Sequence, residues 1–142
     1  MMRTDLIHTL TDTPIMDWIN YVHTSVEDYD ISLGVILTAG IYGYGLSGDD
    51  LVEFARRCLE RLVAEGAIPV LHEGTEYCPF VPTLRYGRKP ADIVENVLAS
   101  WQAGGGGVTG WGEYSFTMPE NILPEWVEQW EKGLPVEVDE EG

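Results

Sequence analysis

The sequence predicts one α+β domain that is mostly helical, and three observations support this prediction. The chain has 142 residues, the usual size of a single domain with a buried core. Its apolar fraction of 44%, with five Trp and seven Tyr, excludes a disordered chain. Apolar residues recur at helical spacing in several segments, and short β-branched runs separate these segments. We expect residues 1–135 to form one globular domain and residues 136–142 to form an acidic, flexible tail.

The first helix is predicted to begin at Thr13-Pro14, with Thr13 as the N-cap and Pro14 at the first helical position. Its buried face is predicted by four apolar residues at helical spacing, Ile15, Trp18, Ile19 and Val22. The acidic segment 27–30 then interrupts the pattern. Residues 31–42 are apolar on nearly every side, which predicts a core helix that ends at the glycines 43 and 45.

The strongest helical pattern covers residues 48–65. Ser47 is placed as its N-cap, with Asp50 three residues later in a capping-box arrangement, and Gly66 is placed as the C-terminal cap. An unbroken apolar stripe predicts the buried face: Leu51, Phe54, Ala55, Cys58, Leu59, Leu62 and Val63.

The second half of the chain predicts shorter elements. Residues 67–71 favour a strand that Pro69 places at a sheet edge, followed by turn residues and a return strand over 77–81. Pro90 begins a helix whose apolar stripe is Ile93, Val94, Val97, Leu98 and Trp101. We expect a strand within 108–118 and a final short helix over 124–132.

The order of these elements over residues 31–81 resembles a winged helix. The resemblance rests on a buried helix, a glycine-rich break, a helix ending Leu62-Val63-Ala64-Glu65-Gly66, and two strands joined by a turn. It implies a winged-helix-like core, with an extra strand and a short helix added toward the C-terminus. It also implies a DNA-binding transcriptional regulator, whose second helix would enter the major groove and contact phosphates through Arg56, Arg57 and Arg61.

The charge of the chain points to a different partner. There are 24 acidic and 8 basic residues, a net charge of -16. The acids concentrate in residues 4–55 and 90–142, whereas six of the eight cations lie between Arg56 and Lys89. Asp49, Asp50 and Glu53 occupy the leading turn of the helix that would read DNA. Such a surface disfavours nucleic acid and anionic membranes and favours a basic protein.

In its general character the chain resembles the immunity proteins of bacterial toxin systems. Like them, it is small, very acidic, rich in aromatic residues and without a catalytic motif. The resemblance implies a protein that binds a basic toxin domain or enzyme and blocks it, rather than an enzyme. No residue is carried over from this likeness, because it involves no motif.

Two acidic groups are the candidate partner-binding residues: Asp49, Asp50 and Glu53 near the start of one helix, and Glu125, Glu128 and Glu131 on the last. The second group follows i, i+3, i+6 spacing, which suits either a contact surface or a solvated helix face. Trp126 and Trp130 share one face of that helix, where they can anchor a partner or pack the helix onto the domain. The tail is either a solubilising end or a phosphate mimic.

The remaining residues predict no cofactor and no metal site. His72 and Cys78 lack the second ligand pair of a zinc site, and Gly104–Gly107 lacks the Lys and Ser/Thr of a phosphate loop. Cys58 and Cys78 are expected to be free thiols, and the absence of a secretory signal suggests a cytoplasmic protein. The cations Arg85, Arg88 and Lys89 can bind an anion or pair with nearby carboxylates.

Overall fold

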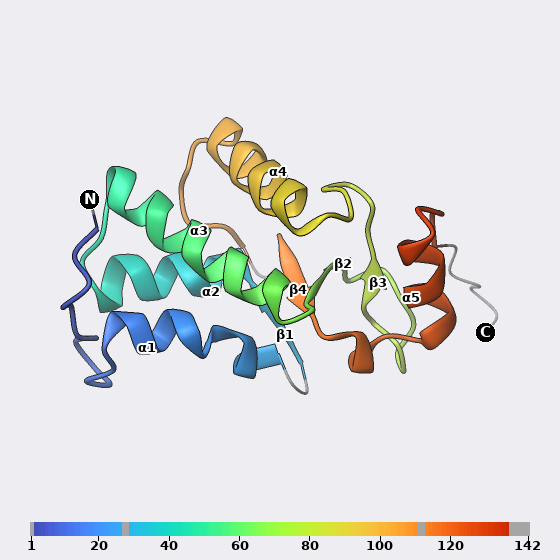
Figure 1. The fold of residues 1–142 in the computed structure, drawn as a ribbon, viewed down its shortest axis with the longest axis horizontal. Helices are drawn as coiled ribbons and strands as arrows, with labels where there is room; N and C mark the ends of the chain where they lie inside the picture. The colour runs from blue at the N-terminus through green and yellow to red at the C-terminus, as the bar shows by residue number, and fades with distance from the viewer. Residues whose placement is uncertain (1, 27–28, 111–112, 137–142) are drawn as a thin grey trace.

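The fold is α+β, as predicted, with helices packed around a small antiparallel sheet (Figure 1). The computed structural model describes residues 2–26, 29–110 and 113–136. Within them the α-helices are α1 (Ile15–Asn20), α2 (Leu33–Thr38), α3 (Gly48–Ala64), α4 (Pro90–Ala103) and α5 (Pro124–Glu131). The strands are β1 (Asp30–Ser32), β2 (Ile68–Leu71), β3 (Val81–Pro82) and β4 (Ser115–Thr117). No helix within these residues is long and apolar enough to cross a membrane.

One hydrophobic core extends from Met2 to Trp130 and joins the helices to the sheet. Helix α3 lies at the centre of the helical part, in contact with α1, α2 and α4. Its predicted stripe is buried in full, and so is the predicted stripe of α4. Helix α5 stands apart at the end of the molecule that carries the C-terminus, opposite the end that carries the N-terminus (Figure 1).

The sheet has the order β1-β4-β2-β3, and all its pairs are antiparallel. Strand β4 comes from outside residues 31–81, yet it lies between β1 and β2. Ile31 of β1 and Pro69 of β2 therefore both face Phe116, which is fully buried. One of the two inner strands of the sheet is therefore supplied by the C-terminal part of the chain.

The prediction that Pro69 marks an edge strand is wrong, because β2 pairs on both sides. A residue of an antiparallel strand directs its N–H and C=O toward the same neighbour. The Pro69 carbonyl accepts a hydrogen bond from the Thr83 N–H at 3.0 Å, on the β3 side. The donor that proline lacks is thus missing from the short β3 pairing and not from the pairing with β4.

Two predicted strands are shorter than expected. The return strand predicted over 77–81 is reduced to Val81–Pro82, because residues 74–79 bond among themselves, with the Gly74 N–H donating to the Pro79 carbonyl at 3.1 Å. The strand predicted over 108–118 is reduced to Ser115–Thr117, since Tyr114 has a φ of 52° and ends the extended run. Part of that prediction, at 111–112, lies outside the described residues, as does the acidic segment 137–142.

The N-terminal half contains two further corrections. Residues 31–32 belong to β1, so the core helix begins at Leu33 and continues through a π-helical turn to Gly43. Thr13 does not cap α1, because Pro14 occupies the N-cap position. The Ile15 N–H donates to the Leu6 carbonyl at 2.9 Å instead, so the preceding segment satisfies this helix start without a side-chain cap.

Candidate functional site

The two predicted acidic groups lie at opposite ends of the molecule. The first turns of α3 are at the end that carries the N-terminus, and α5 is at the end that carries the C-terminus (Figure 1). The structure therefore does not bring the six carboxylates together. They are two separate surfaces.

The group on α3 is partly used by the fold. The Glu53 carboxylate accepts a hydrogen bond from the Met2 N–H at 2.9 Å and pairs with Arg57 at 3.4 Å. Asp49 is exposed and Asp50 is half-buried, both in the first turn, where the helix dipole favours negative charge. These contacts and positions give much of this acidic group a structural role, because they stabilise α3.

The group on α5 is open to solvent. Glu125, Glu128 and Glu131 are all exposed. Glu128 forms an ion pair with Lys132 at 2.8 Å, in which the hydrogen bond and the charge lower the pKa of the Glu128 carboxyl. Both side chains of this pair are about two-thirds exposed, at 65% and 63%, so the pair is weak and exchanges readily for another cation.

The two tryptophans of α5 face the protein. Trp126 and Trp130 are 7% and 8% exposed, and the Trp130 indole N–H donates to the Thr83 carbonyl at 2.9 Å. Of the two roles open to them, packing of the helix is the one the structure supports. Indoles this buried present little surface to a partner, so the binding surface of α5 is sought on its opposite face.

The three arginines of α3 are partly exposed, and each also contacts a neighbouring helix. Arg56 pairs with Glu95 of α4. Arg57 pairs with Glu53 and contacts the Met16 sulfur of α1. Arg61 pairs with Glu65 and donates to the Asn20 carbonyl at the end of α1. These contacts join α3 to the helices on either side of it.

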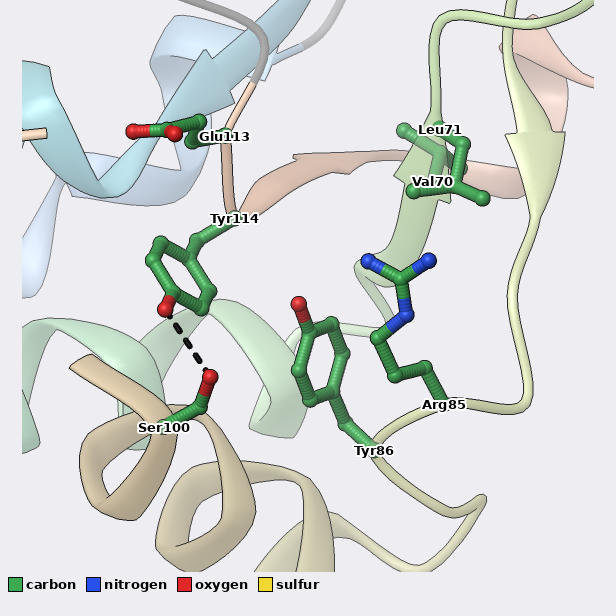
Figure 2. Close-up of a pocket in the computed structure, with 7 residues that line it drawn as sticks. All are labelled: Val70, Leu71, Arg85, Tyr86, Ser100, Glu113 and Tyr114. Carbon is green, nitrogen blue, oxygen red and sulfur yellow. Dashed lines mark hydrogen bonds between the residues drawn. The ribbon is translucent and has the colours of Figure 1, made fainter. Parts of the chain in front are cut away.

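A polar pocket of about 230 Å³ lies where the loop after β3 approaches α4 and the start of β4 (Figure 2). Tyr86 is buried, and its backbone carbonyl accepts a hydrogen bond from the Asn96 side chain of α4 at 2.9 Å. The Tyr114 hydroxyl and the Ser100 hydroxyl are 2.9 Å apart, and the two tyrosine rings are 5.9 Å apart at their centroids. Arg85 supplies the cation, and the half-buried Leu71 supplies an apolar contact.

Burial and Arg85 act on the Tyr86 phenol in opposite directions. Burial raises the pKa of Tyr86, and the hydrogen bond and charge of Arg85 lower it by less. The phenol therefore stays protonated near neutral pH and can donate a hydrogen bond. Figure 2 shows its hydroxyl directed into the space between Tyr114 and Arg85.

Sequence reasoning found only one part of this pocket, the cation Arg85. The tyrosines and Ser100 come from three separate segments, and no spacing in the sequence relates them. The φ of 52° at Tyr114, uncommon for a bulky residue, is also invisible in the sequence. Of the two roles open to these cations, ion pairing is found neither for Arg85, which pairs with no carboxylate of the described residues, nor for Arg88, which donates to the Glu131 carbonyl.

The histidines and cysteines form no larger constellation in the part of the chain that the structure describes. His72 bonds to the Asp30 carboxylate at 2.7 Å, a pair that the sequence did not suggest. Cys58 and Cys78 are free, as predicted, and burial raises the pKa of the Cys58 thiol well above its ordinary value. Across residues 2–26, 29–110 and 113–136, no three His, Cys, Asp or Glu side chains gather into a potential metal site.

Comparisons with protein-family models, with curated proteins and with solved structures found no match to this chain. Its surfaces and its pocket are therefore interpreted from their own chemistry.

Proposed function

We propose that this protein is an immunity- or inhibitor-type protein that binds and neutralises a basic toxin or enzyme. The binding surface is the outer face of α5, which carries Glu125, Glu128 and Glu131. The observation that carries the proposal is the exposure of all three carboxylates on one helix whose opposite face is anchored by two buried tryptophans. A fixed row of like charges suits recognition of a basic surface.

The charge of the whole chain supports the same partner class. A net charge of -16 creates a field that attracts a basic protein from a distance and repels nucleic acid. The three glutamates then provide close contacts where the partner docks. Because Lys132, which follows directly after α5, forms only an exposed pair with Glu128, a partner's Lys or Arg can replace it at little cost.

A groove beside α5 complements the acidic face of this helix. The groove, of about 450 Å³, lies between α5 and the start of α4, and its lining includes Glu131, Asp92, Trp130, Arg88 and Lys89. A groove of this size admits a partner's side chain next to the acidic face. The surface therefore offers a hollow for orientation as well as charge for attraction.

The proposal is tested by co-expression with the product of the neighbouring gene, which should be toxic alone and harmless together with this chain. The triple variant Glu125→Gln/Glu128→Gln/Glu131→Gln should lose protection and associate more slowly with the purified partner. The control Asp49→Asn/Asp50→Asn/Glu60→Gln removes the same charge from α3 and should keep protection. Loss of protection only in the control would move the site to α3, and association insensitive to salt would overturn the electrostatic mechanism.

The alternative is a winged-helix DNA-binding regulator. The order α2, α3, β2, β3 over residues 33–82 favours it. The contacts of Arg56, Arg57 and Arg61 with α1, α4 and neighbouring glutamates weigh against it, since these cations would have to leave their partners to reach phosphates. A gel shift at moderate salt that disappears in Arg56→Gln/Arg61→Gln would establish this alternative, and no retardation of any duplex would remove it.

A further inference from the structure

Arg85 differs from most cations of this chain in its surroundings. With three acids for every base, cations readily find carboxylates: Arg3, Arg56, Arg57, Arg61 and Lys132 each form an ion pair. Among the described residues no carboxylate lies within ion-pair distance of Arg85 or Lys89. Both residues are exposed, but Lys89 lies at the N-cap of α4, whereas Arg85 lines the pocket described above.

The pocket places hydrogen-bond donors around this cation. Figure 2 shows the Arg85 guanidinium and the Tyr86 hydroxyl facing the same space, with the Tyr114 and Ser100 hydroxyls on its far side. The Tyr114–Ser100 hydrogen bond uses one donor of that pair, which leaves the other hydroxyl hydrogen free. A guanidinium and phenol donors together suit an oxyanion, because guanidinium binds carboxylate or phosphate oxygens in pairs.

The rest of the lining selects among oxyanions. Glu113 also lines the pocket, although its carboxylate is directed away from Arg85 and Tyr86 (Figure 2) and accepts a hydrogen bond from the Gly110 N–H at 2.8 Å. Its negative charge acts on the Tyr86 phenol and therefore disfavours a dianion more than a monoanion. Leu71, which is half-buried, provides an apolar contact for a hydrocarbon group. At about 230 Å³ the space is smaller than the roughly 300–1,000 Å³ of sites for drug-sized ligands, so the ligand is small.

We propose that this pocket is a binding site for a small organic monocarboxylate. Arg85 binds the carboxylate, the Tyr86 hydroxyl donates to one of its oxygens, and Leu71 contacts the apolar part of the ligand. The positive φ of Tyr114 supports a built site, because backbone strain in a bulky residue persists where surrounding contacts hold it. Here those contacts are the Ser100 hydroxyl and the Leu33 N–H, which donates to the Tyr114 carbonyl at 3.1 Å.

The proposal does not depend on the function assigned to α5, and its test needs no partner protein. Benzoate is titrated into the ¹⁵N-labelled chain, with benzamide as the neutral analogue and inorganic phosphate as the competing oxyanion. Benzoate should cause saturable shifts of the backbone amides at 85–86 and 113–115. Benzamide should cause none, and phosphate should bind more weakly than benzoate.

Three variants locate the contact. Arg85→Gln should weaken benzoate binding at least about tenfold, the loss expected for a charge-assisted hydrogen bond. Tyr86→Phe should weaken it by about two- to tenfold. Lys89→Gln removes the same charge from a nearby exposed site and should leave the affinity within about twofold. Amide spectra of each variant establish that it is folded.

Four results would overturn the site. These are benzoate shifts that do not saturate, equal binding of benzamide, tighter binding of phosphate than of benzoate, or equal losses in Arg85→Gln and Lys89→Gln. Benzoate shifts that do not saturate would mean that no site exists. Equal binding of benzamide would mean that the pocket recognises only the aromatic ring. Tighter binding of phosphate would mean that the site takes phosphate and not a carboxylate. Equal losses in Arg85→Gln and Lys89→Gln would mean that the benzoate effect depends only on the general charge of the surface.

Discussion

Thr83 and Pro69 face each other across the β2–β3 pair, and Trp130 completes their hydrogen bonding. Residues in such a pair normally exchange two N–H···O bonds, but proline has no N–H to donate. The Thr83 N–H donates to Pro69, and the Thr83 carbonyl accepts from the Trp130 indole at 2.9 Å in a buried position. An indole from α5 thus replaces the donor that Pro69 lacks, and it ties α5 to the edge of the sheet.

Trp130→Phe should therefore destabilise the protein more than Trp101→Phe. Both substitutions shrink a buried ring and remove an indole N–H, but Trp101 donates to the carbonyl of the exposed Gly107, which water can satisfy. The Thr83 carbonyl would be left without a donor, a loss of about 1–3 kcal/mol. We expect urea denaturation to show a difference of about 1–2 kcal/mol between the two variants. Equal losses would mean that the Thr83 hydrogen bond contributes little.

At the scale of the element, the two ends of α3 differ in what holds them. Ser47 occupies the N-cap position with an extended backbone, but its side chain makes no capping hydrogen bond. At the other end Gly66 has a φ of 100°, its N–H donates to Val63, and the Ala67 N–H donates to Leu62 at 2.9 Å. The chain reversal into β2 depends on this left-handed residue.

Alanine substitution at the two ends of α3 should therefore change the stability of the protein by different amounts. Gly66→Ala should destabilise the protein by about 1 kcal/mol or more, because alanine at a positive φ is strained. Ser47→Ala should cost less than about 0.5 kcal/mol, below the usual cost of losing a side-chain cap. Chemical denaturation of the two variants checks both values. A larger loss at Ser47 than at Gly66 would show that the serine hydroxyl caps the helix in solution.

The helices were more predictable than the strands. The apolar stripes of α3 and α4 and the bounds of α5 followed from periodicity, since a helix is defined by neighbours three and four residues apart. Strand β1 was assigned to a helix, because an apolar run such as Ile31-Ser32-Leu33 suits either element. Residues 30–32 form a strand because they pair with β4, more than 80 residues later. No local sequence pattern predicts that pairing.

At the scale of the whole molecule, charge repulsion is the dominant electrostatic feature. Ion pairs engage several cations, yet 24 acids against 8 bases leave most carboxylates without an opposite charge. The compact state brings these charges closer together than the unfolded chain does, which costs stability. The ion pairs are mostly exposed and offset little of this cost.

Added salt should therefore stabilise the protein. Raising NaCl from about 0.01 M to about 0.15 M shortens the Debye length from roughly 30 Å to roughly 8 Å and screens the repulsion. We expect the midpoint of thermal unfolding to rise over this range. The Glu125→Gln/Glu128→Gln/Glu131→Gln variant should begin higher and rise less. A midpoint that falls with salt would mean that the ion pairs outweigh the repulsion.

The candidate site was predictable only in part. The acidic residues of α5 could be named from their spacing, and their exposure agrees with a contact surface or a solvated face. The burial of Trp126 and Trp130 could not be decided, because a shared helix face can be turned inward or outward. The pocket could not be found, since Arg85, Ser100 and Tyr114 meet only when α4 and β4 are in place.

By itself, the sequence determined the α+β class, the long helices and the excess of negative charge. These are properties of composition and of neighbours a few residues apart. The tertiary structure decided that β4 lies between β1 and β2, that the two acidic groups stand at opposite ends, and that the arginines of α3 bond to α1 and α4. It also assembled the Arg85 pocket. Each of these depends on which distant segments pack together, and that is set by burial and pairing across the whole chain.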